Sequence, residues 1–331
     1  MTYYFCGLNW NSENNSVIMI YGSPNSPNFL RKKLNIGDEL NISILNRRFC
    51  IGTETTQSQR ISCYQRRIND KEKEIKSNYF LSTPNTPIKN QSDIDSFILP
   101  DNKNYKQCFR CTMLDYFKCR MICVGDYCNP TTKKAESKCT PAKTHVYITS
   151  VADRLKVGVS LRIPGRWLEQ GSDLATKIAI APGLEARQLE QYISKFHNLK
   201  LQVTNKEKIS NLQVSQNSEK INTFNSLTNK IYDDLNEKYK YHNSIKIIEP
   251  QTINLSSIYG SLPLNQPIQN IDINPNNSLG GKIIAIKGSI LVRQLGKYYY
   301  SINLRSMINR EFEFLQNPPQ IETQSFLDQW F

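Results

Sequence analysis

Six of the nine cysteines lie in one short polar segment, and their spacing is typical of a metal site. They follow one another as C-x2-C-x7-C-x3-C-x4-C-x10-C, at Cys108, Cys111, Cys119, Cys123, Cys128 and Cys139. Zinc takes four nitrogen or sulfur ligands in a tetrahedral arrangement, and a CxxC turn directs two thiolates to one ion. Cys108 and Cys111 form such a pair, and several later cysteines can complete the site.

Two cysteines outside this segment, Cys50 and Cys63, bring the candidate ligands to eight once Cys6 is set aside. Eight thiolates make two four-cysteine zinc sites, although one site with spare thiols is equally allowed. Alternatives are buried thiols that pack as small hydrophobic groups, a redox CxxC pair or an iron–sulfur cluster. The polar surroundings and the lack of a thioredoxin-like βαβ pattern favour structural zinc, one or two ions.

The composition is that of a basic, folded protein. Lys and Arg number 42 against 29 Asp and Glu, which gives a net charge of +13. Such an excess favours a polyanionic partner, chiefly DNA or RNA. No apolar run is long enough to span a membrane, and the N-terminus lacks the pattern of a signal peptide. We therefore expect a cytoplasmic protein with no membrane partner.

Residues 145–197 hold a second group of side chains that could do chemistry, and their pattern predicts elements in the order ββαβα. Strands are expected at 146–149 and 154–160, joined by a tight turn. A helix is expected to start at Pro164, where a missing N–H costs nothing. A third strand at 177–181 precedes a second helix.

Two glycines in this segment have specific structural tasks. Gly158 marks a close approach within the second strand. Gly171 ends the first helix in a left-handed conformation. Further along the chain, Phe224, Leu227, Ile231 and Leu235 recur at helical spacing, which predicts one amphipathic helix within 205–243.

The ββαβα order resembles that of the GIY-YIG nuclease superfamily. Val146-Tyr147-Ile148 is similar to the first strand motif, and Lys156-Val157-Gly158 is similar to the second. Arg166 follows Lys156 by ten residues, the spacing at which such enzymes place a helix arginine. A helix glutamate follows, here Glu185 or, as the second choice, Glu190.

This resemblance implies a site that cleaves phosphodiester bonds with one divalent ion, Mg²⁺ or Mn²⁺. Tyr147 would activate water or act as the base, Arg166 would hold the phosphate, and Glu185 would bind the metal. Four further residues are candidates for the site. Lys156 and Arg162 would add positive charge, and Trp167 would stack on a base or pack in the core. His145 would bind zinc or point into the cleft.

One departure from the superfamily bears on catalysis. The tyrosine of the second motif is replaced by Lys156, and a lysine acts as a base at neutral pH only when its pKa is depressed. The sequence is therefore compatible with two functions. The first is a nucleic-acid-binding protein that cleaves as an endonuclease; the alternative is a non-catalytic, zinc-dependent nucleic-acid-binding or adaptor protein.

A second resemblance covers most of the chain. The string RWLEQGS at 166–172 is similar to the RW(I/L)(D/E)QG(A/S) signature of an uncharacterised prokaryotic family, domain of unknown function 2797. Other similar motifs occur in that family's order: Cys50-Ile51-Gly52, Cys108-Phe109-Arg110-Cys111, His145-Val146-Tyr147, Lys156-Val157-Gly158-Val159-Ser160, Gly288 after Ile286-Lys287, and Ile302-Asn303-Leu304-Arg305. This resemblance implies little about function.

The expected architecture is α+β, in four regions. These are a β-rich region with a polar loop (1–100), a Cys-rich zinc segment (101–145), a GIY-YIG-like core plus a helix (146–245), and a β-rich region (246–331). The two β-rich regions are expected to pack together.

The strands of the last region carry their own aromatic and basic residues. An aromatic-basic surface for single strands would use Tyr298, Tyr299, Tyr300, Arg293 and Arg305, although simple sheet packing is the favoured interpretation.

Overall fold

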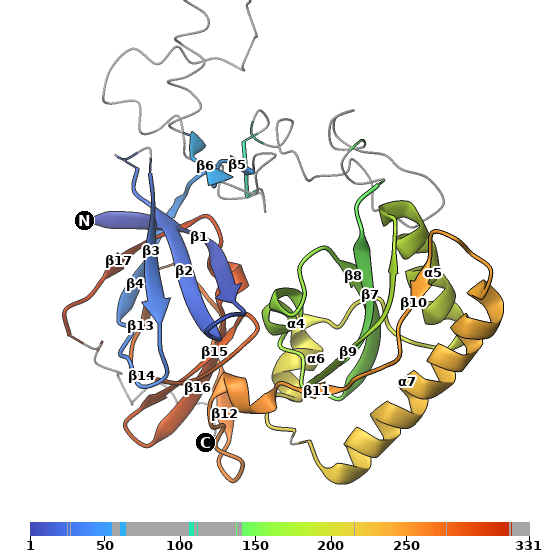
Figure 1. Cartoon of the computed structure of the whole chain (residues 1–331). Coiled ribbons are helices and arrows are strands. Elements are labelled where there is room, and N and C mark those ends of the chain that lie inside the picture. Colours follow the sequence, from blue (N-terminus) through green and yellow to red (C-terminus); the bar gives the residue numbers. More distant parts are fainter. Residues whose placement is uncertain are drawn as a thin grey trace, which may run out of the picture.

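Both ends of the chain and its middle contribute strands, and helices cover the central sheet. The computed structural model describes residues 1–24, 26, 28–54, 60–63, 106–108, 111, 137, 141–214, 216–275, 277–317 and 319. In this part the chain is a mixed α+β protein that is rich in strands, as expected (Figure 1).

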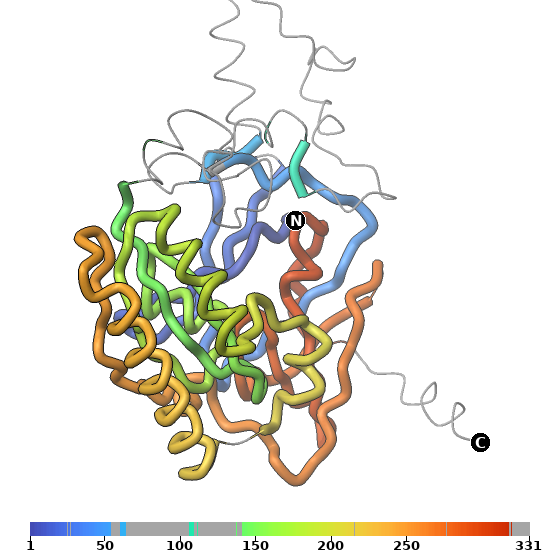
Figure 2. Tube along the Cα trace, turned by 90° about the vertical axis from the view of Figure 1, so that its right-hand side faces the viewer, coloured from blue at the N-terminus to red at the C-terminus, as the bar shows by residue number. Residues whose placement is uncertain are grey.

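The N-terminal strands and the strand near the C-terminus share one antiparallel sheet. Its six strands are β1 (Thr2–Asn11), β2 (Ser16–Gly22), β3 (Phe29–Leu34), β4 (Ile42–Arg48), β13 (Ser278–Leu279) and β17 (Arg310–Phe314). The order is β13-β4-β17-β1-β2-β3, so β17 lies between two N-terminal strands, with Tyr3 opposite Phe312. Figure 2 shows the same arrangement from the side, with blue and red segments side by side.

A second sheet packs against the first and shares its core. It has the order β12-β16-β15-β14. The bounds are β12 (Ile268–Asn270), β14 (Lys282–Lys287), β15 (Ile290–Leu295) and β16 (Tyr298–Asn303). Phe5 and Ile42 of the first sheet join Leu291 and Ile302 of the second in one buried cluster. Both sheets together are called the β part below. A separate short pair, β5 (Thr53–Glu54) and β6 (Arg60–Ile61), lies beside it.

The central segment runs in the order ββαβα. Its elements are β7 (Thr144–Val151), β8 (Arg154–Ser160), α4 (Gly165–Gln170), β9 (Leu174–Ala181) and α5 (Gly183–Phe196). The sheet has the order β10-β9-β7-β8, with β10 (Lys246–Ile247) at one edge and β11 (Ile253–Asn254) also pairing with β9. This segment, with the helices that follow it, is called the α/β part.

Helices cover both faces of the central sheet. In Figure 1, α5 and α7 (Ser218–Tyr239) lie on the outer face, whereas α4 and α6 (Asn205–Ser210) lie on the face toward the β part. Val146 and Ile148 of β7 pack with Ile193 of α5 and Ile231 of α7 in a second buried cluster. The neighbouring Tyr147 points to the opposite face because side chains alternate along a strand.

The local signals for turns and helix ends are confirmed. Ala152 and Asp153 form the tight turn between β7 and β8, both with positive φ. Pro164 immediately precedes α4, and Gly171 ends it with φ of 72°.

The amphipathic helix predicted within 205–243, after a linker, is α7, and the stretch expected as the linker also holds a short helix, α6. Thr204 and Glu207 form a capping box that starts α6, and Asn217 caps α7 through its side chain. Two separate caps start two helices, because each satisfies its own free N–H groups. The expected apolar stripe is present in α7, where Phe224, Ile231 and Leu235 are buried.

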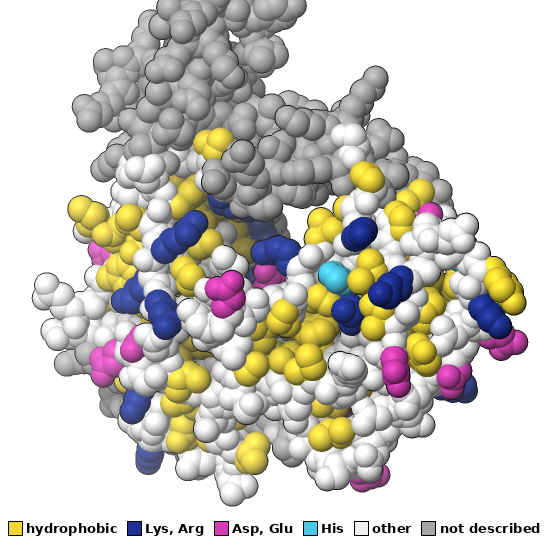
Figure 3. All heavy atoms as spheres, in the orientation of Figure 1, with side chains coloured by type: hydrophobic (Ala, Val, Ile, Leu, Met, Phe, Trp, Pro, Cys, Tyr) yellow, Lys and Arg dark blue, Asp and Glu magenta, His cyan; other side chains and the backbone are white. Residues whose placement is uncertain are grey.

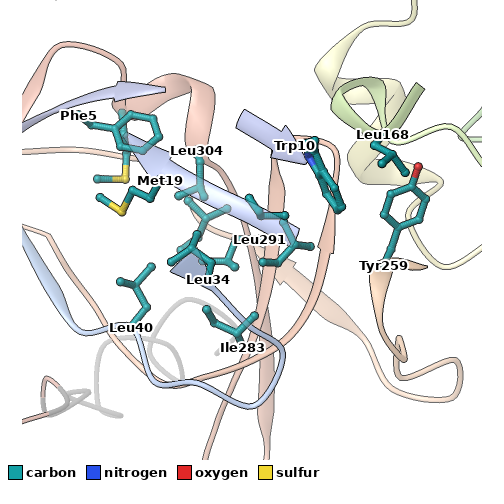
Figure 4. Packing of buried hydrophobic residues seen from close by; sticks show 14 of the residues in the cluster. Phe5, Trp10, Met19, Leu34, Leu40, Leu168, Tyr259, Ile283, Leu291 and Leu304 are labelled. Carbon is teal, nitrogen blue, oxygen red and sulfur yellow. The ribbon is translucent and has the colours of Figure 1, made fainter. Parts of the chain in front are cut away.

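The β part and the α/β part are joined by a continuous apolar contact. Figure 4 shows Trp10 of β1 and Tyr259 of a 3-10 turn, η2 (Ser256–Tyr259), between the β-part core and Leu168 of α4. The Tyr259 hydroxyl donates to the Ser172 carbonyl at 2.7 Å, and the Trp10 indole donates to the Gly288 carbonyl at 2.9 Å. Among the described residues, no helix is long and apolar enough to cross a membrane.

Candidate functional site

Four cysteines that are far apart in sequence meet beside the β5–β6 pair. The sulfur atoms of Cys50, Cys63, Cys108 and Cys111 all lie within 4.8 Å of one another. The Cys63 and Cys108 sulfurs are 3.9 Å apart. Sulfurs around one zinc ion are expected roughly 3.8 Å apart, since each Zn–S bond is about 2.3 Å. The Cys108 backbone N–H donates to the Cys50 sulfur at 3.2 Å. The donor set therefore fits one tetrahedral zinc ion.

The remaining cysteines divide into one that stands apart and four outside the described residues. Cys6 is buried and donates weakly to the Tyr4 carbonyl at 3.7 Å; burial raises the pKa of its thiol. Cys6 is not part of the four-cysteine group, which agrees with its exclusion from the candidate ligands. The candidate ligands Cys119, Cys123, Cys128 and Cys139 lie outside the described residues.

A basic pocket of about 300 Å³ opens on the α4 side of the central sheet. Four cationic side chains line it: Lys156 from β8, Arg166 from α4, Lys208 from α6 and Arg305 from η3 (Leu304–Met307). No acidic residue of the described chain is among its lining residues, which otherwise are Val151, Gln170, Leu201, Gln202, Val203 and Asn205. Such a set attracts an anion.

Lys156 is the most deeply placed of these cations. The residue is 8% exposed, and its ammonium makes no hydrogen bond or ion pair with any residue that the structure describes. Burial, and then the charge of Arg166, lowers the pKa of Lys156 to about 8. A buried charge without a partner is costly, so the site favours a ligand that neutralises it.

Lys208 connects α6 to the end of α4. Its ammonium donates to the Gln170 carbonyl at 2.9 Å, one of the free carbonyls that end a helix. Burial, followed by the charge of Arg305, lowers the pKa of Lys208 to about 7. The charges of Lys156 and Arg166 also reach it and act in the same direction.

Tyr147 does not line this pocket; it is buried next to it and contacts the lining residue Gln170. Its hydroxyl accepts a hydrogen bond from the Gln170 side chain at 2.9 Å, and burial raises its pKa. A Cβ added at Gly158 would lie 2.5 Å from the Tyr147 hydroxyl, which explains the glycine in the second strand motif. The other amide atom of Gln170, Oε1, is buried without a partner in the described structure.

The carboxylate near this group is Glu190 and not the expected Glu185. Glu185 accepts a hydrogen bond from Ser244, a residue of the chain beyond α7. Glu190 is 5% exposed and pairs with Arg187 at 2.7 Å, and its charge raises the pKa of both Tyr147 and Lys156. The helical spacing of the two glutamates turns them to different faces of α5, so only one can face the sheet edge.

Arg166 and Arg162 share one acidic partner. Arg166 pairs with Glu169 at 3.1 Å and Arg162 with Glu169 at 3.2 Å. Arg162 stays largely exposed beside α4. Trp167 is 4% exposed and packs edge-on against Tyr147, so its ring lies in the core and is not open to a base.

Two further sequence candidates take other positions. His145 is half-buried on β7, and burial together with Lys177 lowers its pKa; it lies outside the four-cysteine cluster. Arg293 and Tyr300 are buried in the β part, which rules them out of an exposed aromatic-basic surface. Arg305 instead reaches the basic pocket.

Two residues that line the pocket, Gln170 and Lys208, are not predicted as ligand contacts by the sequence. Gln170 belongs to the RWLEQGS motif, which carries only the family resemblance. Arg305 is expected from the sequence at a different site, the aromatic-basic surface, and lines the pocket instead. Lys208 stands in a polar stretch where nothing distinguishes it from its neighbours. Over the face drawn in Figure 3, Lys and Arg side chains are spread across both parts of the protein.

The fold and the site define a strand-rich α+β protein with a four-cysteine cluster and a basic pocket. Residues 101–310 match the family described as a protein of unknown function (DUF2797). The match spans more than half of the chain, so the protein belongs to this family, and the second resemblance in its sequence is confirmed. Neither the comparison with curated proteins nor that with solved structures finds a match.

Proposed function

We propose that this protein binds nucleic acid and places a phosphate group in the basic pocket. The observation that carries the proposal is Lys156, a nearly buried cation that has no partner in the described structure and lines the pocket beside Arg166, Lys208 and Arg305. Phosphate supplies the missing negative charge and accepts several charge-assisted hydrogen bonds. The net charge of +13 adds a long-range attraction for a polyanion.

A binding experiment tests this function directly. Labelled single- and double-stranded DNA and RNA are titrated with the full chain at several salt concentrations. We expect affinity to fall with salt, because bound phosphates release counterions. Lys156→Met should weaken binding about tenfold, since a hydrogen bond from a charged group contributes about 1.5–3 kcal/mol.

Lys246→Met is the matched control, because β10 lies at the edge of the sheet opposite to β8. It should bind as the wild type does. Binding that is absent, or that ignores both salt and Lys156→Met, would instead favour the adaptor alternative, a protein–protein module.

We further propose that Cys50, Cys63, Cys108 and Cys111 hold one structural zinc ion. Their sulfurs are close enough for one tetrahedral ion, and a closed four-thiolate site leaves no open position for chemistry. The cluster would hold residues 106–108 and 111 beside the chain that follows β4. A hydrogen bond from the Ile51 N–H to the Lys106 carbonyl, at 3.2 Å, joins the same two segments. Zinc would therefore stabilise the fold without taking part in a reaction.

Metal analysis of the purified full chain tests the zinc site. Cys111→Ser should lose one equivalent of zinc and unfold at a lower temperature, whereas Cys6→Ser should keep its zinc. Cobalt should give a thiolate charge-transfer band in the wild type that is weakened in Cys111→Ser. Equal metal content in the two variants would show that the cluster does not bind the ion.

Phosphodiester cleavage of the GIY-YIG type is a second candidate function, favoured by the grouping of Tyr147, Lys156 and Arg166 near Glu190. The donor set does not fit a bound Mg²⁺ or Mn²⁺ ion as it stands. Glu190 is already paired with Arg187, Glu169 with Arg166, and the pocket is cationic.

A cleavage assay with Mg²⁺, Mn²⁺ or EDTA separates the two functions. If the protein cleaves, Arg166→Ala and Glu190→Gln should abolish the activity, and Glu185→Gln should retain it. Cleavage that survives both substitutions would come from another site or a contaminant. Salt-sensitive binding without cleavage by folded protein would leave the binding function alone.

A further inference from the structure

Resting on the proposed function, we propose that the basic pocket accepts the terminal phosphate at the end of a nucleic-acid strand and discriminates against internal phosphodiesters. The ligand class is a phosphomonoester carried by an oligonucleotide. Three features of the pocket carry this inference: its charge, its donors and its size.

The charge of the pocket exceeds what one phosphodiester neutralises. Four cationic side chains converge, one from each of β8, α4, α6 and η3. The charge of Lys287 also reaches Lys208. Glu169 offsets part of the Arg166 charge. An internal phosphodiester carries one negative charge, whereas a terminal phosphate carries about 1.5 to 2 at neutral pH.

The donors line one pocket from separate elements and do not follow a single strand or helix. Lys156 approaches from the sheet, Arg166 from the helix that packs on it, and Arg305 from the β part. A terminal phosphate offers three non-bridging oxygens as acceptors, whereas an internal phosphodiester offers two. Contacts to a continuous backbone would instead be expected in a row along an open surface.

The size of the pocket sets a further limit. A volume of about 300 Å³ is at the lower end of the range for small-molecule sites, about 300–1,000 Å³. Such a space takes a phosphate with its attached nucleotide and excludes a stretch of duplex. The buried Gln170 Oε1, unpartnered in the described structure, offers an acceptor to a hydroxyl of that nucleotide.

A comparison of strand ends tests the inference. Internally labelled oligonucleotides of one sequence carry a 5′-phosphate, a 3′-phosphate or hydroxyls at both ends, and the full wild-type chain is titrated with each. We expect one phosphorylated end to bind at least about tenfold more tightly than the hydroxyl ends, because a dianion gains about one further charge-assisted bond. This arm does not depend on the folding of any variant.

Variants then show which residues cause the preference for a phosphorylated strand end. Arg305→Ala, at an exposed position, and Lys156→Met should reduce the preference for the phosphorylated end to within about twofold, with Lys246→Met as the unchanged control. Their thermal unfolding is measured alongside to confirm that they fold.

Other outcomes overturn the inference in distinguishable ways. Equal, salt-sensitive binding of all three oligonucleotides would overturn end recognition and leave the proposed function standing. A nucleoside monophosphate that competes as strongly as the phosphorylated strand would show that the ligand is a free nucleotide. Failure of every oligonucleotide to bind would overturn both the inference and the proposed function.

Discussion

At the scale of single residues, the decisive feature is a pair of lysines that line one pocket. Lys156 occupies a site where its ammonium is largely removed from water, and Lys208 lies in the same pocket. Both have lowered pKa values, of about 8 and about 7, because burial and neighbouring cations disfavour the charged form. Their charge therefore changes within the range where the protein can be studied.

This titration predicts a pH-dependent affinity. The two lysines attract an anion only when protonated, so binding should weaken as the pH rises from 7 to 9. We expect a loss of about tenfold or more when both charges disappear. The probe is an oligonucleotide with the phosphorylated end that the pocket prefers, since the second pKa of that phosphate is about 6 and the group stays mostly a dianion from pH 7 to 9.

The measurement is the dissociation constant at constant ionic strength across this pH range. The charges that act on Lys208 are those of Arg305, Lys156, Arg166 and Lys287, and the pKa of Lys156 is itself lowered to about 8. Lys208→Met should therefore give a flatter profile, shaped by Lys156 alone. A profile that is already flat in the wild type would contradict the assignment.

At the scale of the elements, the β7–β8 hairpin contributes Val151 and Lys156 to the lining of the pocket, and one close contact fixes the pairing of its two strands. Tyr147 on β7 is paired with Gly158 on β8, and its ring occupies the space that a side chain there would need. Lys156 lies two residues before Gly158 and so shares its face of the sheet. The contact thus holds the tyrosine and the lysine in a fixed relation.

Gly158→Ala tests this arrangement. The added Cβ would overlap the Tyr147 ring, and overpacking of this kind costs about 1–3 kcal/mol of stability. Gly165→Ala is the control, since its Cβ would meet nothing closer than the Trp10 carbonyl at 3.9 Å. Urea unfolding should show a clear loss for the first variant and little change for the second. Equal stabilities would show that the ring can move aside.

At the scale of the whole molecule, a buried ion pair joins the β part to the α/β part. Lys287 at the end of β14 lies 2.6 Å from Asp173 at the start of β9, with side chains 7% and 3% exposed. Close by, the backbones of Gly171 and Gly288 approach closely; a Cβ on Gly288 would lie 2.8 Å from the Gly171 nitrogen. This junction holds Arg305 of the β part at the pocket of the α/β part.

Breaking the pair should destabilise the entire chain. Asp173→Ala leaves the Lys287 charge buried and unpaired, which typically costs about 3–5 kcal/mol. The double variant Asp173→Leu with Lys287→Met removes both charges and should be less destabilised than the single variant. Urea unfolding followed by circular dichroism measures both. If Asp173→Ala loses less unfolding free energy than the double variant does, the ion pair contributes little to stability.

The sequence by itself determined the features that depend on local chemistry. The helix start after Pro164 and the left-handed Gly171 follow from the backbone preferences of those residues. The turn at Ala152–Asp153 follows from the short gap between two strand-like runs, since alanine does not favour the positive φ that it adopts there. The family membership and the choice of Cys108 and Cys111 as candidate metal ligands also follow from short motifs. Each of these needs only neighbours within a few positions.

Only the tertiary structure decided which distant residues meet. It grouped Cys50 and Cys63 with Cys108 and Cys111. It turned Glu190 toward Tyr147 and Lys156 in place of Glu185, and it completed the pocket with Lys208 and Arg305. These choices depend on which face of a helix is buried and on how two separately built layers pack. That packing is a property of the whole folded chain, and no local stretch of sequence encodes it alone.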